Sequence, residues 1–283
     1  MSQRAGIGVG VHLIVGGYPP GSPAAHDMDY VRLRLLGELA TSPAAEGRHT
    51  TVSPDYGGLG RWLAPASLLV TYAAGPVPTD DEHADLRAWL EAGGRWLALH
   101  GSSGGRAAKV ERDGRTRRMM VRQPHHATLG GFFLNHPPVQ RFTVRVAEGS
   151  THPLVAGLPA SFEAVDELYL IELQDPEHTE VLLTTELEAD PSPPGFGFAY
   201  DADTSVLDSR GTRALGFVHP VGDGAVAYVA LGHTHSPATN GQPFVDRSVT
   251  PDGVTPTTFR GVWESDEFLH LVRNGIAWGL ADR

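Results

Sequence analysis

Cysteine is absent from this sequence of 283 residues. Its absence excludes disulfides, Cys-ligated zinc, iron–sulfur clusters and a thiol nucleophile. Long apolar runs are also missing, because no stretch reaches the roughly 18 residues that a membrane-spanning helix requires. The first residues lack the apolar core and cleavage site of a secretory leader. We therefore expect a soluble, cytoplasmic protein that does not enter a membrane.

Positive charge is scarce. The 22 Lys and Arg residues stand against 33 Asp and Glu residues, which gives a formal net charge of −11 at pH 7. Such an acidic chain disfavours nucleic acid and anionic membranes as partners. The hydrophobic fraction of 41% and the charged fraction of 19% are typical of a globular protein. Because no repeat or clear linker interrupts the chain, we expect one domain over residues 1–283, either as a monomer or as a homo-oligomer.

The first half of the chain alternates between apolar runs and amphipathic stretches. Residues 9–15, 50–52, 67–72 and 95–99 have the composition of strands. Apolar residues at helical spacing follow His26, and a capping-box sequence at Thr79 begins a second helix that extends to about Ala92. This β-α-β-β-α-β order predicts a doubly wound α/β sheet with mainly parallel strands.

The second half is less regular. Strands are predicted at 142–146, 167–173 and 180–184, and a hairpin joins 214–218 to 225–231 through 221–224. The histidine pair at 125 and 126 is expected in a surface loop. Residues 186–197, rich in proline and glycine, predict a loop. A second loop, 236–261, is long enough to be mobile or to act as a lid, and a last helix begins near residue 265.

Two apolar runs each end on a histidine beside a glycine. Residues 95–99 lead into His100 and Gly101, and residues 225–231 lead into Gly232 and His233. Apolar runs of this kind are typical of strands buried on both faces of a parallel sheet, where ligands bind beyond the carboxyl ends of the strands. We therefore expect His100 and His233 to lie at the same edge of one sheet.

A third histidine, His136, lies in a turn-rich segment. A catalytic zinc site uses three protein ligands, and His100, His136 and His233 could supply them, with Asp166 or Glu167 as a ligand or base. None of the spacings forms a local metal motif. The alternative is that each histidine is a hydrogen-bonded residue that orients loops at a strand end, and that the two acids are solvated where a strand begins.

Residues 101–105 match the Gly-x-Ser-x-Gly pattern of a nucleophile elbow, which would make Ser103 a nucleophile. The elbow requires a packed helix next. The basic run at 106–122 follows instead, and it predicts a solvated excursion, so a serine hydrolase is the weakest hypothesis. The glycines at 6–10 precede their strand, and they therefore fail as a dinucleotide-binding fingerprint.

Taken in order, several segments resemble the ThuA-like (trehalose-utilisation) family, whose fold is similar to class I glutamine amidotransferases. The resemblance covers almost the whole chain. Its segments are residues 26–27, 88–94, 97–101, 129–132, 136–137, 152–154, 157–158, 166–169, 232–233 and 274–278. One departure is Thr234, which stands where an aspartate is common in the family.

The resemblance implies a flavodoxin-like three-layer sandwich with a mainly parallel central sheet and extra β elements in the second half. It also implies a role in sugar catabolism, since the family is linked to disaccharides, including oxidised 3-keto forms, and a histidine-bound metal is plausible in some members. The amidotransferase relatives use a nucleophilic cysteine. This chain has none, so glutaminase chemistry is excluded.

The expected function is therefore that of a carbohydrate-metabolism enzyme acting on a (3-keto-)disaccharide or related sugar. Histidine- and metal-assisted acid/base chemistry would carry the reaction, with zinc as the first candidate metal. The expected catalytic residues are His100, Glu167 and His233, and the expected metal ligands are His100, His136 and His233. The expected substrate-binding residues are His26, Asp27, Gly101, Ser102, Asp166 and Tyr169.

The alternative is a non-catalytic sugar-binding or accessory protein. Such a protein would use hydrogen-bonding residues and aromatic platforms, for which Tyr18, Phe132 and Trp263 are candidates. It would have no perturbed pair of titrating groups in its pocket. In both cases a small-molecule carbohydrate is the expected partner.

Overall fold

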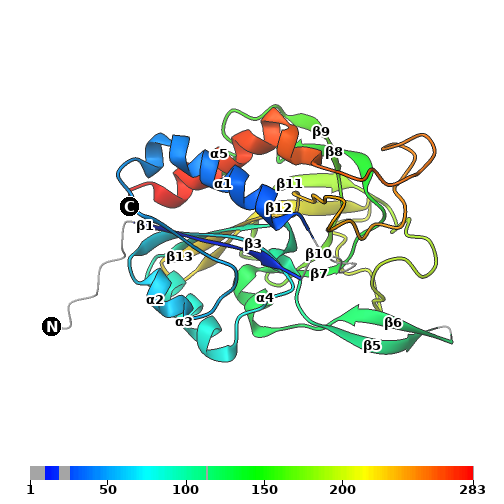
Figure 1. Ribbon diagram of the computed structural model, residues 1–283, viewed down its shortest axis with the longest axis horizontal. Coiled ribbons are helices and arrows are strands. Elements are labelled where there is room, and N and C mark those ends of the chain that lie inside the picture. Colours follow the sequence, from blue (N-terminus) through cyan, green and yellow to red (C-terminus); the bar gives the residue numbers. More distant parts are fainter. Residues whose placement is uncertain (1–9, 19–25, 113, 283) are drawn as a thin grey trace.

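A nine-stranded sheet forms the centre of the computed structural model, which describes residues 10–18, 26–112 and 114–282 (Figure 1). One part of the sheet is parallel, and the chain's later strands extend it with antiparallel neighbours. The parallel strands, in sheet order, are β2 (Thr50–Ser53), β1 (Gly10–Gly17), β3 (Ala66–Ala74), β4 (Arg95–Leu99) and β13 (Gly224–Val229). The antiparallel strands are β12 (Thr212–Val221), β11 (Glu180–Glu186), β8 (Gln140–Val146) and β9 (Ser161–Asp166).

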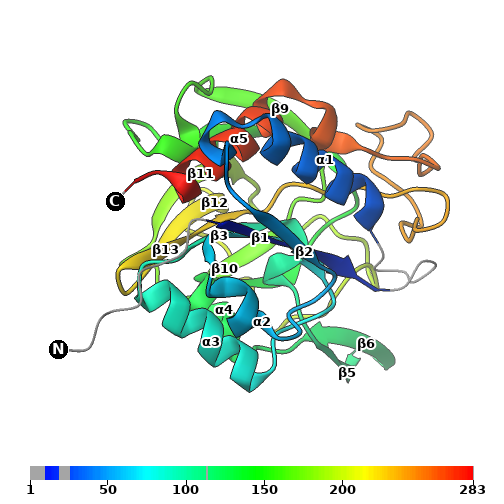
Figure 2. The ribbon, with the colours of Figure 1, turned by 60° about the vertical axis from the view of Figure 1, so that its left-hand side comes forward.

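Helices cover both faces of the sheet (Figures 1 and 2). On one face α1 (Met28–Thr41) packs beside α5 (Asp266–Leu280). The other face carries α2 (Leu59–Leu63), α3 (Asp80–Glu91) and α4 (Pro124–Leu129). Because both faces are covered, the central strands β3 and β4 are almost wholly buried and need no polar alternation. The three-layer α/β architecture predicted from the sequence is confirmed.

Two short sheets extend the molecule near the carboxyl ends of the parallel strands. One pairs β7 (Gly131–Asn135) with β10 (Leu170–Leu173). The other is the hairpin of β5 (Ala107–Arg112) and β6 (Arg115–Met120), which projects from the body of the protein in Figure 1. Most of the hairpin's side chains are exposed, as expected for the basic run.

Two local predictions are wrong. Residues 167–173 do not form one strand. β9 ends at Asp166, and residues 167–169 link it to β10. The Asp166 carboxylate accepts the backbone N–H of Glu167 and so fixes the start of this link. Residues 124–129 form α4, which proline begins and Gly130 ends in the left-handed conformation. His125 and His126 are therefore buried and do not lie in a surface loop. The short helix α2 has no counterpart among the elements predicted from the sequence.

The other predicted elements agree with the structure. β1 covers the described part of strand 9–15, whereas residues 6–9 lie outside the described part of the chain. The hairpin through 221–224 joins β12 to β13. Thr79 and Ser265 cap α3 and α5 through their side chains. None of the helices in the described ranges combines the length and apolar composition that a membrane span needs.

A pair of glycine substitutions tests how the turn before β13 packs. A Cβ atom at Gly224 would overlap the carbonyl oxygens of Gly94 and Leu90, whereas a Cβ at Gly37, on the exposed side of α1, would meet no atom within 4 Å. We expect Gly224→Ala to lower the free energy of unfolding by about 1–3 kcal/mol. Gly37→Ala should raise it by about 0.5–1 kcal/mol through helix propensity. Urea unfolding measures both, and equal effects would contradict this packing.

Candidate functional site

His100 is the first residue after β4 and has a strained backbone. Its φ of +44° is the only positive value for a non-glycine residue in the described ranges, and such a conformation costs on the order of 1–3 kcal/mol. The hydroxyl of Tyr228 donates to the His100 carbonyl oxygen at 2.9 Å, and the hydroxyl of Ser103 lies 3.3 Å from the same oxygen. The surrounding structure therefore fixes where this buried imidazole lies.

The serines after His100 do not form a nucleophile elbow. A single 3-10 turn, His100–Ser103, leads into the exposed β5–β6 hairpin where an elbow needs a packed helix. The Ser103 hydroxyl lies 2.7 Å from the Tyr228 hydroxyl, and the Ser102 hydroxyl lies 2.8 Å from Oγ1 of Thr71. Both serines are buried and neither lines the cavity at the sheet edge. The serine-hydrolase hypothesis therefore has no geometric support.

His233 follows β13 on a peptide that is bound from both sides. The carboxylate of Asp166 accepts the backbone N–H groups of Gly232 at 2.7 Å and of His233 at 2.9 Å. From the other side, the hydroxyl of Tyr72 and the indole N–H of Trp263 each donate to the Gly232 carbonyl oxygen at 2.8 Å. Gly232 has a φ of +134°, which suits glycine. The position of His233 is thus set by buried hydrogen bonds to its backbone.

Backbone carbonyls determine the tautomers of two site histidines. Nδ1 of His100 lies 2.8 Å from the Ala230 carbonyl oxygen, and Nδ1 of His136 lies 2.8 Å from that of Pro137. Since a carbonyl oxygen can only accept, each Nδ1 carries the hydrogen. The Nε2 atom of each neutral ring therefore presents a lone pair.

A relay determines the tautomer of His233. Nε2 of His235 lies 2.8 Å from the Pro256 carbonyl oxygen and must donate to it, which leaves Nδ1 of His235 as an acceptor. Nε2 of His233 lies 3.0 Å from that acceptor and donates to it. The remaining nitrogen, Nδ1 of His233, is buried and has no hydrogen-bond partner.

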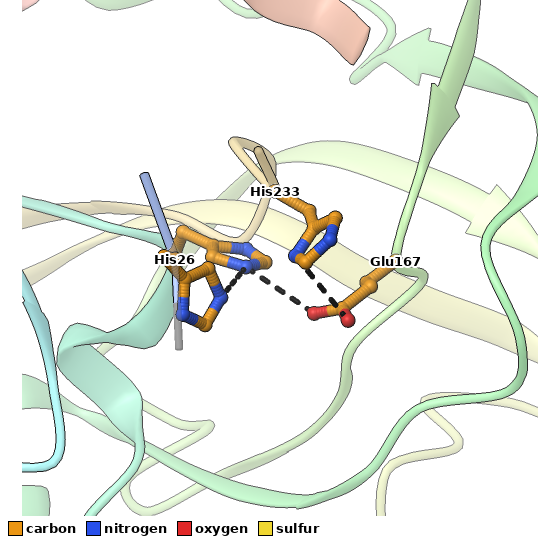
Figure 3. Close-up of side chains that lie close together, drawn as sticks. His26, Glu167 and His233 are labelled. Carbon is orange, nitrogen blue, oxygen red and sulfur yellow. Dashed lines mark hydrogen bonds and ion pairs between the residues drawn. The ribbon is translucent and has the colours of Figure 1, made fainter. Parts of the chain in front are cut away.

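These lone pairs meet at Glu167, the residue after β9 (Figure 3). Nε2 of His100 lies 3.4 Å from Oε2 of Glu167, and Nδ1 of His233 lies 3.3 Å from Oε1. Nε2 of His136 is 3.6 Å from Oε1. His26, which precedes α1, brings its Nε2 to 3.1 Å from Nε2 of His100. One ligand atom from each of His26, His100, Glu167 and His233 lies within 4.8 Å of the others.

This donor set fits a divalent metal ion. Bare imidazole nitrogens and carboxylate oxygens are both acceptors, so at these distances they repel one another unless a cation or a proton lies between them. The buried Nδ1 of His233 makes no hydrogen bond, although Oε1 of Glu167 lies 3.3 Å away. Three imidazoles and one carboxylate are ligands that zinc and similar transition metals prefer.

Burial and charge shift the pKa values of the site in opposite directions. Burial raises the pKa of the Glu167 carboxyl, but the surrounding imidazoles, led by His136 and His233, outweigh it and hold that pKa well below its usual range. Burial lowers the pKa of His100, yet the Glu167 and Asp166 carboxylates raise it above its ordinary value overall. Burial, together with the neighbouring His100 and His235 rings, lowers the pKa of His233 to about 4 although the Glu167 carboxylate opposes this shift. An ionised Glu167 therefore faces a neutral His233.

The cluster opens into a cavity of about 560 Å³, which is within the range of small-molecule sites. Its wall includes the basic hairpin and parts of the two predicted loops. Of the predicted site residues, those that line the cavity are His26, Gly101, His136, Glu167, Tyr169 and His233. His100 lies behind this surface, stacked on the Tyr169 ring with the centroids 4.2 Å apart.

Three predicted substrate contacts lie elsewhere. Asp27 accepts the N–H of Tyr30 at the start of α1 and pairs with Arg260 at 2.6 Å. Asp166 binds backbone N–H groups, and Ser102 binds Thr71. Each of these residues supports the site from behind. Of the proposed aromatic platforms, Tyr18 lines the cavity, whereas Phe132 and Trp263 are buried outside it.

Several residues of the cavity wall were not predicted from the sequence. Phe196 and Phe198 come from the loop predicted at 186–197 and just beyond it, and Gln242 and Phe244 come from the long loop at 236–261. The only signal was the alternation of glycine and phenylalanine at 195–198, which gives no indication of a partner. His26 was predicted as a substrate contact, and the structure places it among the four potential ligands.

The chain is similar to known proteins both in its sequence family and in its fold. A family model described as ThuA, trehalose utilisation, matches residues 60–246, which is more than half of the chain. No curated protein matches the sequence.

Two solved structures share the fold over nearly the whole chain. A ThuA-like protein from Parabacteroides merdae is 16% identical, with a TM-score of 0.57, over 97% of this chain and 90% of that one. A ThuA-like protein from Bacteroides uniformis is 17% identical, with the same TM-score of 0.57, over 96% of this chain and 92% of that one. A glutamine amidotransferase from Thermotoga maritima is also similar, at 10% identity and a TM-score of 0.43, over 97% of this chain and 99% of that one.

The role of Asp166 as the anchor of the His233 peptide is testable. Asp166→Asn replaces a carboxylate that accepts three backbone N–H groups, those of Glu167, Gly232 and His233, with an amide that turns a donor toward one of them. We expect the free energy of unfolding to fall by about 2–4 kcal/mol. Asp29→Asn, at a 93% exposed side chain, is the control and should change it by less than about 0.5 kcal/mol. Similar values for the two variants would show that Asp166 anchors nothing.

Proposed function

Because the chain belongs to the ThuA (trehalose-utilisation) family, we propose that it is a carbohydrate-metabolism enzyme acting on a disaccharide, including 3-keto forms. The observation that supports a catalytic role is the convergence of imidazole lone pairs on the Glu167 carboxylate at the wall of the cavity. Family membership supports the sugar class. The volume of the cavity is sufficient for a ligand of this size.

The second part of the proposal is a divalent metal, with zinc as the first candidate. His26, His100, Glu167 and His233 would hold it, and His136 is the next nearest imidazole to the carboxylate. When bound, such an ion supplies Lewis acidity to a carbonyl or hydroxyl oxygen of the sugar. The relay through His235 and the carbonyl of Ala230 keep the ligand nitrogens of His233 and His100 free of hydrogen.

The residues themselves suit proton transfer beside a carbonyl group. Glu167 and His233 both line the cavity, so either can reach a bound sugar, and His136 lies beside them. We propose that Glu167 or His136 moves a proton to or from the carbon or oxygen next to the sugar carbonyl. Hydrolysis, elimination and isomerisation all need such a step. Tyr169 stacks on the rings of both His100 and His136 and limits how far either can rotate.

A non-catalytic sugar-binding protein is the alternative. That function predicts a cavity of hydrogen-bonding and aromatic groups without perturbed titrating residues. The cavity instead contains Glu167, whose pKa is held well below its usual range, and His233, whose pKa burial lowers to about 4. These shifts favour the enzyme over the accessory protein.

Metal analysis of freshly purified protein tests the proposal. We expect stoichiometric zinc or another divalent transition metal by plasma mass spectrometry, and loss of turnover of 3-ketotrehalose on chelation. His233→Ala should abolish metal binding. His235→Ala removes only the relay and should weaken metal affinity by roughly 10–100-fold.

An exposed histidine provides the control. His178 lies outside the cavity with 68% of its side chain exposed, so His178→Ala should keep both the metal and the turnover. Metal-free protein that still binds the disaccharide would favour the accessory function. Metal retained at full affinity in His233→Ala would place the ion elsewhere.

A further inference from the structure

Gln242 has a buried acceptor that nothing in the structure uses. Its side-chain Nε2 donates to Oε1 of Glu167, which fixes the orientation of the amide because an amide oxygen would be repelled by the carboxylate. Oε1 of Gln242 is buried and has no hydrogen-bond partner. A buried acceptor left unpaired costs about 1–3 kcal/mol. Gln242 itself lines the cavity, so a ligand that displaces the atoms covering this acceptor can supply the missing donor.

Two phenylalanines lie close to each other in the same wall. Phe196 and Phe244 come from loops far apart in the sequence, and their ring centroids are 5.3 Å apart. Both line the cavity, and Phe244 is 37% exposed. The pair therefore offers an apolar surface to whatever occupies the cavity.

The loop that carries Phe196 is held in place before any ligand binds. The Asn135 side chain, itself buried, accepts the N–H of Phe198 at 2.8 Å, and a Cβ at Gly197 would overlap that same amide oxygen. From the hairpin, Arg117 donates to the Phe196 carbonyl oxygen at 3.0 Å. The basic hairpin thus has a structural use, which is to fix the loop.

The aromatic pair is continuous with the ionised cluster through His136. Nε2 of His136 lies 3.6 Å from Glu167, and its ring meets the edge of Phe196 with the centroids 5.8 Å apart. Gln242 spans the same interval, because it binds Glu167 and stands two residues before Phe244. The wall therefore runs without a break from the Glu167 carboxylate to the two phenylalanines.

We propose that Gln242, Phe196 and Phe244 form a subsite for the second ring of a disaccharide. A pyranose ring has hydroxyl groups around its edge and C–H groups on its faces. The free Oε1 of Gln242 accepts one hydroxyl, and the phenylalanine pair packs against a C–H face. The first ring then lies at the Glu167 cluster. This inference rests on the proposed function. It predicts that the protein's affinity for a sugar depends on how many rings the sugar has, in addition to the chemistry of each ring.

Calorimetric titration of the full-length protein with two-ring and one-ring probes tests the subsite. The probes are trehalose and 3-ketotrehalose against glucose and 3-ketoglucose. We expect Phe244→Ala and Phe196→Ala each to weaken binding of the two-ring sugars by roughly tenfold, and to change one-ring binding by less than about twofold. Gln242→Leu also removes the hydrogen bond to Glu167, so it should weaken binding of both classes, and that of the two-ring sugars more. Val254→Ala, in the same loop but 62% exposed and outside the cavity, is the control and should bind all four as wild type does.

The outcomes separate the subsite from the proposed function. Wild-type affinity for the two-ring sugars in all three variants would overturn the subsite and leave the proposed function intact. Equal losses for one-ring and two-ring sugars would also overturn it, because the residues would then contact the first ring. If wild-type protein bound none of the four sugars, the proposed function would fail and the subsite with it. Circular dichroism melting of each variant separates loss of affinity from loss of fold.

Discussion

The site depends on hydrogen bonds that point away from it. His100, His136 and His233 each use one ring nitrogen to bind the protein, and this leaves the other nitrogen as a lone pair directed at Glu167. If a hydrogen moved to the other nitrogen, the ring would lose both its bond to the protein and its ligand atom. The protein therefore selects one tautomer for each ring, and an electron-rich pocket results.

Forming this pocket destabilises the folded state locally, and hydrogen bonds from other strands compensate. The backbone of His100 is strained, Asp166 is buried with a pKa raised to about 7 by burial, and a histidine nitrogen lies buried without a partner. The compensating bonds come from strands far apart in the sequence, such as the Tyr228 hydroxyl on the His100 carbonyl oxygen. Because β4 and β13 are parallel neighbours, their two terminal histidines reach the same edge of the sheet. The topology thus brings the ligands together, and the local hydrogen bonds orient them.

The sequence predicted the regular part of this arrangement and not the irregular part. The apolar runs that precede His100 and His233 were enough to place both residues at one edge, since parallel strands end together. The strand β7 and the helix α4 were missed because their boundaries depend on tertiary contacts and on a left-handed glycine, Gly130. His26 and Gln242 could not be assigned as partners of His100 and Glu167. Their pairing depends on the path by which long loops come back to the sheet, and no residue spacing in the sequence predicts that path.

The proposed metal centre requires that the lone pairs at Glu167 bind one ion. The most direct measurement is anomalous diffraction at the zinc absorption edge from crystals of zinc-loaded protein. We expect a single strong anomalous peak within bonding distance of Nδ1 of His233, Nε2 of His100 and a Glu167 carboxylate oxygen. A fully loaded protein whose peak lies away from these atoms, or whose His233 Nδ1 faces no ion, would contradict it.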